Sequence, residues 1–160
     1  MTIAQSVVSS FLVKLPFTWS ANWAWGVPLI VLTVVIHVLG LGFIKNRAFS
    51  ASQKNGRRRY RMTASVILIA GVTLSAIGLH ALEAAIWAVA YVRLGALADL
   101  RAAMLYSLNA VTSYGHTNLE LAQHWYLMGA LEALNGWLLF GLTTAFLFSV
   151  IDKVWMPENR

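Results

Sequence analysis

Three long apolar segments restrict this chain to folds that suit a lipid bilayer. They run over Gly26–Ile44, from Met62 to about Val92, and over Trp125–Val150. Each is long enough for the roughly 20 apolar residues that a helix needs to cross the hydrocarbon core. Hydrophobic residues make up 59% of the 160 residues and charged residues only 11%, too few charges for the surface of a small soluble domain. We therefore predict an all-α integral membrane protein with three transmembrane helices.

Basic residues gather between the first two apolar segments. Between Lys45 and Arg61 lie seven of the twelve Lys and Arg residues, and we interpret this stretch as a short loop between two helices. The positive-inside rule places such a loop in the cytoplasm. The N-terminus is then outside, the C-terminus is cytoplasmic, and the expected location is the inner membrane of the cell. Headgroups of membrane lipids are the expected partner of the loop, and the clustering argues against a nucleic-acid partner.

The same pattern predicts how the chain is divided. Trp19, Trp23, Trp25 and Trp155 flank the apolar segments, as interfacial anchors do. Helical spacing of apolar residues near the N-terminus fits an amphipathic helix in the outer interface, and a disordered tail is the alternative. The expected parts are an N-terminal interfacial segment, a first transmembrane helix with the basic loop, a pore-domain-like unit and a C-terminal tail, at residues 1–25, 26–62, 63–155 and 156–160.

A short helix is predicted between the second and third apolar segments. Asp99 is a suitable N-cap residue, and the helix from Leu100 to about Val111 would be near 17 Å long at about 1.5 Å per residue, too short to cross a bilayer. Its C-terminal end, which favours cations, adjoins the polar residues 112–115. Non-helical backbone at membrane depth must be buried in protein or line water. We therefore predict a re-entrant pore helix and a filter-like loop.

These features resemble the two-transmembrane, pore-loop potassium-channel family over about residues 79–150. That family's filter reads Thr-Val-Gly-Tyr-Gly-Asp, and its backbone carbonyls replace the water around the ion. The segment Leu131-Glu132-Ala133-Leu134-Asn135-Gly136 is similar to the start of the family's inner helix. The resemblance implies a homotetramer that conducts a monovalent cation, K⁺ or Na⁺. Aligned on the tyrosine, the filter-like residues are Val111, Thr112, Ser113, Tyr114, Gly115 and His116.

Three departures from that filter bear on function. Ser113 replaces a glycine whose backbone freedom a side chain would restrict. Val111 replaces the threonine whose hydroxyl forms the innermost ion site, and His116 replaces the outer aspartate. We therefore expect a cation channel with a non-standard filter. The alternative is a non-conducting, channel-like membrane subunit that binds a partner protein or a lipid.

Carboxylates within apolar segments are costly and usually face the protein interior. Glu83 and Glu132 are two such residues, and we expect both to support the pore helix together with Asp99 and Asn109. His80 and Glu83 stand three residues apart and can pair on one helical face.

Cofactor sites and catalytic groups are not expected. Counted from the basic loop, His37 lies roughly 12 Å and His80 roughly 26 Å from the inner side at about 1.5 Å per residue, which argues against a haem held by both. His116, Glu120 and His124 would share a face only as a helix, so no metal site is predicted. The sequence contains no cysteine and no recognisable nucleophile–base pair or phosphate-binding loop, so we do not expect an enzyme.

Overall fold

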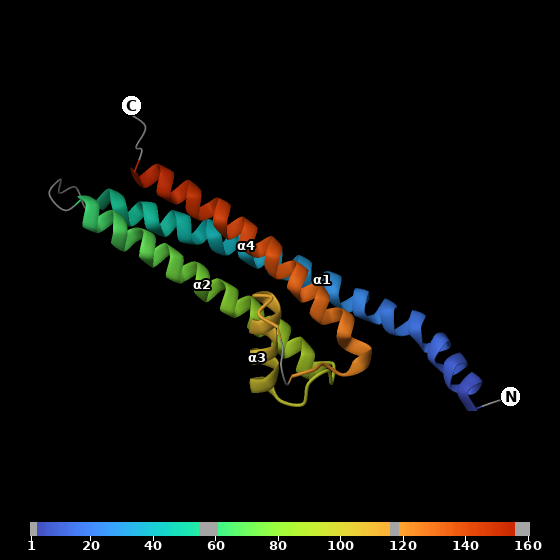
Figure 1. Ribbon diagram of the computed structural model, residues 1–160. Helices are drawn as coiled ribbons and strands as arrows, with labels where there is room; N and C mark the ends of the chain where they lie inside the picture. Colours follow the sequence, from blue (N-terminus) through green and yellow to red (C-terminus); the bar gives the residue numbers. More distant parts are fainter. Residues whose placement is uncertain (1–2, 55–60, 116–118, 156–160) are drawn as a thin grey trace. The chain divides into compact units, whose positions relative to one another are not determined.

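A computed structural model describes residues 3–54, 61–115 and 119–155, and these residues form helices joined by turns (Figure 1). Among these described residues, three stretches are long and apolar enough to cross a membrane, which confirms the predicted number of candidate spans and the all-α class. They are Trp19–Ala48, Met62–Arg93 and Gln123–Trp155. The helices are α1 (Ile3–Lys54), α2 (Arg61–Arg93), α3 (Leu100–Val111), the short 3₁₀ helix η2 (Gln123–Trp125) and α4 (Tyr126–Trp155).

Helix α1 is longer than the sequence pattern suggested. It continues to Lys54, so Lys45 and Arg47 lie on a helix and not in a loop, and that part of the prediction was wrong. The error arose because charged residues mark the end of an apolar segment, whereas the backbone hydrogen bonds of the helix can continue through them. Residues 45–54 contain neither proline nor glycine to stop the helix. The predicted segment 1–25 belongs to α1 from Ile3 onward, and its place at the membrane surface stays a prediction.

The described residues fall into two compact units. The first unit combines the chain up to Leu32 with Ala84–Gly136, and the second combines Thr33–Glu83 with the chain from Trp137 onward. Each unit therefore joins segments that are far apart in the sequence.

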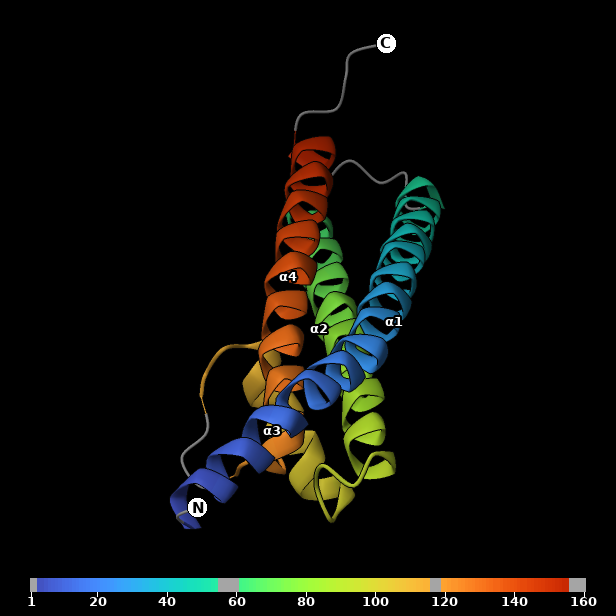
Figure 2. The same ribbon diagram turned by 90° about the vertical axis from the view of Figure 1, so that its right-hand side faces the viewer.

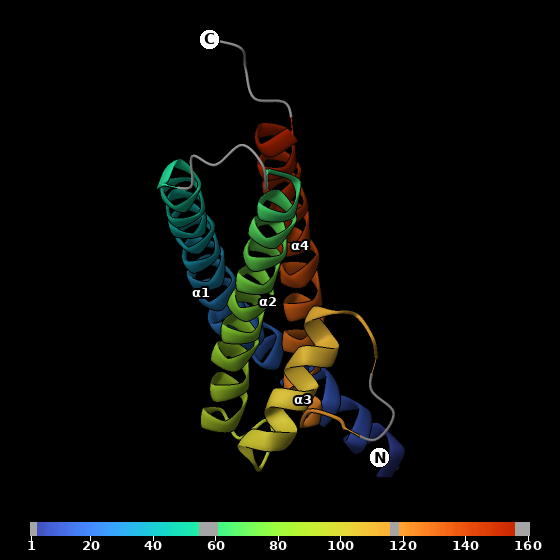
Figure 3. The same cartoon turned by 90° about the vertical axis from the view of Figure 1, so that its left-hand side faces the viewer.

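An aromatic core holds the first unit together. Trp87 and Tyr91 of α2, Tyr106 of α3 and Trp125 of η2 belong to one buried cluster. The rings of Tyr91 and Tyr106 meet edge to face with 5.4 Å between their centroids, a favourable aromatic arrangement. As a result, α3 lies against the last turns of α2 and the first turns of α4 (Figure 3).

Three helical segments lie side by side in the second unit, where α1 and α4 run in one direction and α2 runs in the other (Figure 2). Toward one end of this unit, Ala48, Val72 and Val150 form a small apolar cluster. Elsewhere in the same unit, His37, His80, Glu83 and Thr143 are buried. Buried polar side chains need hydrogen-bond partners, and these four side chains contact one another.

Candidate functional site

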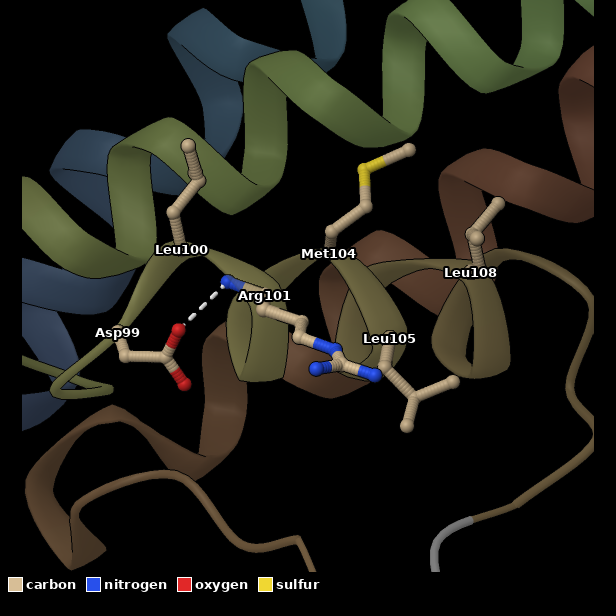
Figure 4. A pocket seen from close by; sticks show the side chains of 6 residues that line it. All are labelled: Asp99, Leu100, Arg101, Met104, Leu105 and Leu108. Carbon is tan, nitrogen blue, oxygen red and sulfur yellow. Dashed lines mark hydrogen bonds between the residues drawn. The ribbon is translucent and has the colours of Figure 1, made fainter.

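Helix α3 begins at Leu100 and has Asp99 as its N-cap, as predicted. The Asp99 carboxylate accepts a hydrogen bond from the backbone N–H of Arg101 at 2.8 Å (Figure 4) and another from that of Ala102 at 3.1 Å. This satisfies two of the donors that a helix start leaves without an intrahelical partner. Just before it, Gly95 takes a φ of +67°, a conformation that suits glycine and lets the chain turn after α2.

One face of α3 is buried and the other is open. Ala103, Tyr106, Ser107, Ala110 and Val111 are buried. On the open side, side chains at the start and along the length of the helix line a shallow, mainly apolar hollow (Figure 4), formed by Asp99, Leu100, Arg101, Met104, Leu105 and Leu108.

Glu132 connects its own helix, α4, to α2 and α3. Its carboxyl group accepts a hydrogen bond of 2.6 Å from the Tyr91 hydroxyl of α2 and another from the Ser107 hydroxyl of α3. The Ser107 hydroxyl also lies 2.7 Å from the backbone carbonyl oxygen of Ala84. Glu132 and Ser107 are both fully buried, so the position of α3 depends on a polar contact that water does not reach. The sequence suggested supporting roles for Glu132 and for Ser107 on the short helix but did not identify Tyr91 as a partner.

Two glycines of α4 allow α3 to approach closely. A Cβ atom at Gly129 would collide with the Tyr106 hydroxyl, and one at Gly136 would lie 2.9 Å from the Cα of Val111 and closer to its carbonyl oxygen. Small residues permit such approach between membrane helices. Burial raises the pKa of Tyr106 to about 12, so its hydroxyl beside Gly129 stays neutral.

The polar residues after α3 form a hydrogen-bonded turn. The backbone N–H of Ser113 donates to the Ala110 carbonyl at 2.9 Å, and that of Tyr114 donates to the Asn109 carbonyl at 3.0 Å. Asn109 thus contributes its backbone to the turn. The Thr112 hydroxyl donates to the Leu108 carbonyl at 2.7 Å.

Ser113 takes a φ of +54° and Gly115 a φ of +92°. Few residues other than glycine adopt such angles. Ser113 therefore has a glycine-like backbone conformation, and it stands at the position where the potassium-channel filter has a glycine. The Tyr114 side chain is 85% exposed. His116, the last of the predicted filter residues, lies outside the described part of the chain.

Asn22 is a structural residue that the sequence analysis missed. Its side-chain nitrogen donates to the His124 carbonyl at 2.7 Å, and its side-chain oxygen accepts from the backbone N–H of Met128 at 3.0 Å. The second bond satisfies a donor in the first turn of α4. A lone asparagine among the tryptophans of α1 was the available signal.

Glu120, which the sequence placed near His116 and His124, accepts a hydrogen bond from the Tyr126 hydroxyl at 3.0 Å.

Glu83 has different partners from the other predicted supporting residues. It belongs to the second unit, where its Oε1 lies 2.8 Å from His37 Nδ1 and its Oε2 lies 3.4 Å from His80 Nδ1. The second distance agrees with the predicted His80–Glu83 pair. Thr143 Oγ1 of α4 lies 3.0 Å from the Nε2 atoms of both histidines.

The predicted difference in depth between the two histidines was wrong. Their ring centroids are 5.0 Å apart. The depth of His37 was underestimated, because Lys45, from which it was counted, lies inside α1 and not at its end. Counted along the helices themselves, His37 stands 17 residues before Lys54 and His80 stands 19 residues after Arg61, so both lie at nearly the same level.

No known protein family, curated protein or solved structure that was compared with this chain matches it. Two groups of described residues are candidate functional sites. One is the turn at residues 112–115 after α3, and the other is the buried set of His37, His80, Glu83 and Thr143.

Proposed function

We propose that the chain is one subunit of a cation channel whose pathway is lined by backbone carbonyls of Thr112, Ser113 and Tyr114. The observation that carries this proposal is the glycine-like backbone of Ser113 directly after a short helix held between α2 and α4. The C-terminal end of a helix bears partial negative charge and favours a cation. In this proposal α3 re-enters the membrane as a pore helix, and K⁺ or Na⁺ is the permeant ion.

One chain supplies one copy of the turn, so a closed ring of carbonyls requires several chains, and by resemblance we propose four. The open face of α3 is available for such an assembly, because Leu105 and Leu108 are 52% and 37% exposed. Neighbouring subunits and lipid would cover them.

Uptake of ions into liposomes that contain the purified protein tests the proposal. We expect uptake of both K⁺ and Na⁺ with weak preference for K⁺, because the side chain at Ser113 opposes the backbone angle it occupies. Ser113→Gly should raise the ratio of K⁺ to Na⁺ flux several-fold. Glu120→Gln, a change in the same segment between α3 and α4, serves as the control and should leave the ratio of K⁺ to Na⁺ flux unchanged.

Two results would contradict this expectation. A folded wild-type oligomer without flux, in which Ser113→Gly also stays silent, would favour the non-conducting subunit that binds a partner or a lipid. A wild-type protein with strong K⁺ preference that Ser113→Gly does not alter would show that the serine does not limit the filter.

The proposed orientation has the basic region in the cytoplasm and the turn after α3 outside. Single cysteines introduced into this cysteine-free chain as Ser52→Cys and Glu120→Cys test it by labelling with a membrane-impermeant thiol reagent. We expect labelling of intact cells at position 120 only, and at position 52 only after lysis, because basic segments stay on the cytoplasmic side. Labelling of position 52 in intact cells would contradict the proposed orientation and the location proposed for both termini.

A further inference from the structure

Four buried side chains of the second unit form a closed ring of contacts. In order around the ring, Glu83 faces His37 at 2.8 Å, His37 faces Thr143 at 3.0 Å, Thr143 faces His80 at 3.0 Å, and His80 faces Glu83 at 3.4 Å. His37 and Glu83 are at most 1% exposed, and His80 and Thr143 are each 8% exposed. The ring joins α1, α2 and α4, all within the candidate spans.

The ring has one hydrogen fewer than its four contacts need when both histidines are neutral and Glu83 is ionised. Each neutral imidazole brings one hydrogen and the Thr143 hydroxyl brings one more, while an ionised Glu83 brings none. Three hydrogens serve four contacts, so one contact has none. The atoms without a hydrogen-bond partner include His80 Nδ1 and Glu83 Oε2, which face each other. A buried carboxylate at membrane depth is costly without a compensating charge.

We propose that His37, His80 and Glu83 bind a divalent transition metal ion of the zinc type. One ligand atom from each residue lies within 4.8 Å of the ligand atoms of the other two. Ligands about 2.0–2.2 Å from a tetrahedral zinc stand roughly 3.4 Å from one another, the separation that His80 Nδ1 and Glu83 Oε2 already have. Two histidines and one carboxylate form a donor set that zinc uses, with the fourth position left for water.

Thr143 is the positioning residue of this site. Both imidazoles direct Nδ1 toward Glu83 and Nε2 toward the Thr143 oxygen. If both Nε2–H groups donate to that oxygen, both Nδ1 lone pairs are free for the ion. Metal-binding histidines almost always donate their other N–H to an oxygen in this way, which fixes the tautomer and the ring orientation.

A single proton between His80 and Glu83 would also complete the ring and is the competing occupant. Two observations favour the metal. The 3.4 Å separation exceeds the usual 2.7–3.2 Å of an N–H···O hydrogen bond, whereas it equals the spacing of tetrahedral ligands. The shared contact to Thr143 orients both histidines, and a proton needs only one of them. This site departs from the sequence-based expectation of no metal and is independent of the proposed channel.

Zinc binding to the purified full-length protein tests the proposal. The protein carries no polyhistidine tag and has His116→Gln and His124→Gln, so the two other histidines cannot contribute. After treatment with a chelator, Zn²⁺ is titrated against a chromophoric competitor, and Co²⁺ serves as a spectroscopic probe. We expect one ion per chain and visible bands typical of four-coordinate Co²⁺. Affinity should fall on acidification, because metal-binding histidines must be unprotonated.

Variants of the ring separate the metal from the proton. His80→Gln and Glu83→Gln should each weaken Zn²⁺ binding by a factor of at least about 100, since loss of an outer partner alone costs about 10- to 100-fold. Thr143→Val should show that smaller loss, and Thr143→Ser should restore binding because it keeps the hydroxyl. Size-exclusion chromatography and circular dichroism check that each variant folds.

No Zn²⁺ binding by the starting protein would overturn the proposal and leave a proton as the occupant. Binding that survives His80→Gln unchanged would overturn it as well. If His80→Gln does not fold, the Thr143 pair decides, because equal binding by Thr143→Val and Thr143→Ser contradicts the role of the shared oxygen and with it the site.

Discussion

Gly136→Ala is expected to lower the free energy of unfolding by about 3 kcal/mol, near the upper end of the usual cost of overpacking. The added methyl group would meet the backbone of Val111 at the end of α3, and backbone cannot rotate aside as a side chain can. Either α3 moves away from α4 or the contact is strained. Displacement of α3 also displaces the turn at residues 112–115, so any ion flux should be lost with it. Unfolding of the purified protein in a graded detergent mixture measures the change.

Gly141→Ala in the same helix is the matched control. Nothing lies within 4 Å of a Cβ atom at Gly141, and alanine is favoured over glycine in helices by up to about 1 kcal/mol. The two substitutions should therefore have opposite signs. Equal small effects would show that α3 does not approach α4 as closely as the structure has it.

Combined removal of the Tyr91 and Ser107 hydroxyls is expected to lower the free energy of unfolding by about 2–6 kcal/mol, because each of the two Glu132 oxygens left unsatisfied costs about 1–3 kcal/mol. Tyr91→Phe with Ser107→Ala removes the two donors found for the buried carboxyl group of Glu132. The same unfolding measurement applies, with each single variant for comparison.

A third change identifies the cause of that loss. In a Glu132→Leu background the carboxyl group is absent, so the two hydroxyl deletions should cost much less than in the wild type. Tyr126→Phe is the control, since its hydroxyl bonds to Glu120 on the exposed surface, and it should change stability by less than about 0.5 kcal/mol. A full cost in the Glu132→Leu background would place the effect in packing and not in the buried hydrogen bonds.

The sequence alone was sufficient to predict the three apolar helices and the bounds of α3. These features depend on residues that are neighbours along the chain. A run of apolar residues is enough to indicate a span, and Asp99 followed by a helical stretch is enough to indicate where α3 begins. The turn at residues 112–115 was located by composition, but the left-handed backbone of Ser113 was not foreseen.

Only the tertiary structure brought together the residues that act at a distance along the chain. Asn22 bonds to a residue 102 positions away and His37 to one 106 positions away, and no local pattern carries such pairings. The sequence predicted the His80–Glu83 pair but placed His37 far from His80, whereas in the structure the rings of His37 and His80 are 5.0 Å apart and His37 also contacts Glu83. A one-residue change of register rotates a helix by about 100°, so which polar side chains meet inside a membrane protein is settled by the packing of whole helices.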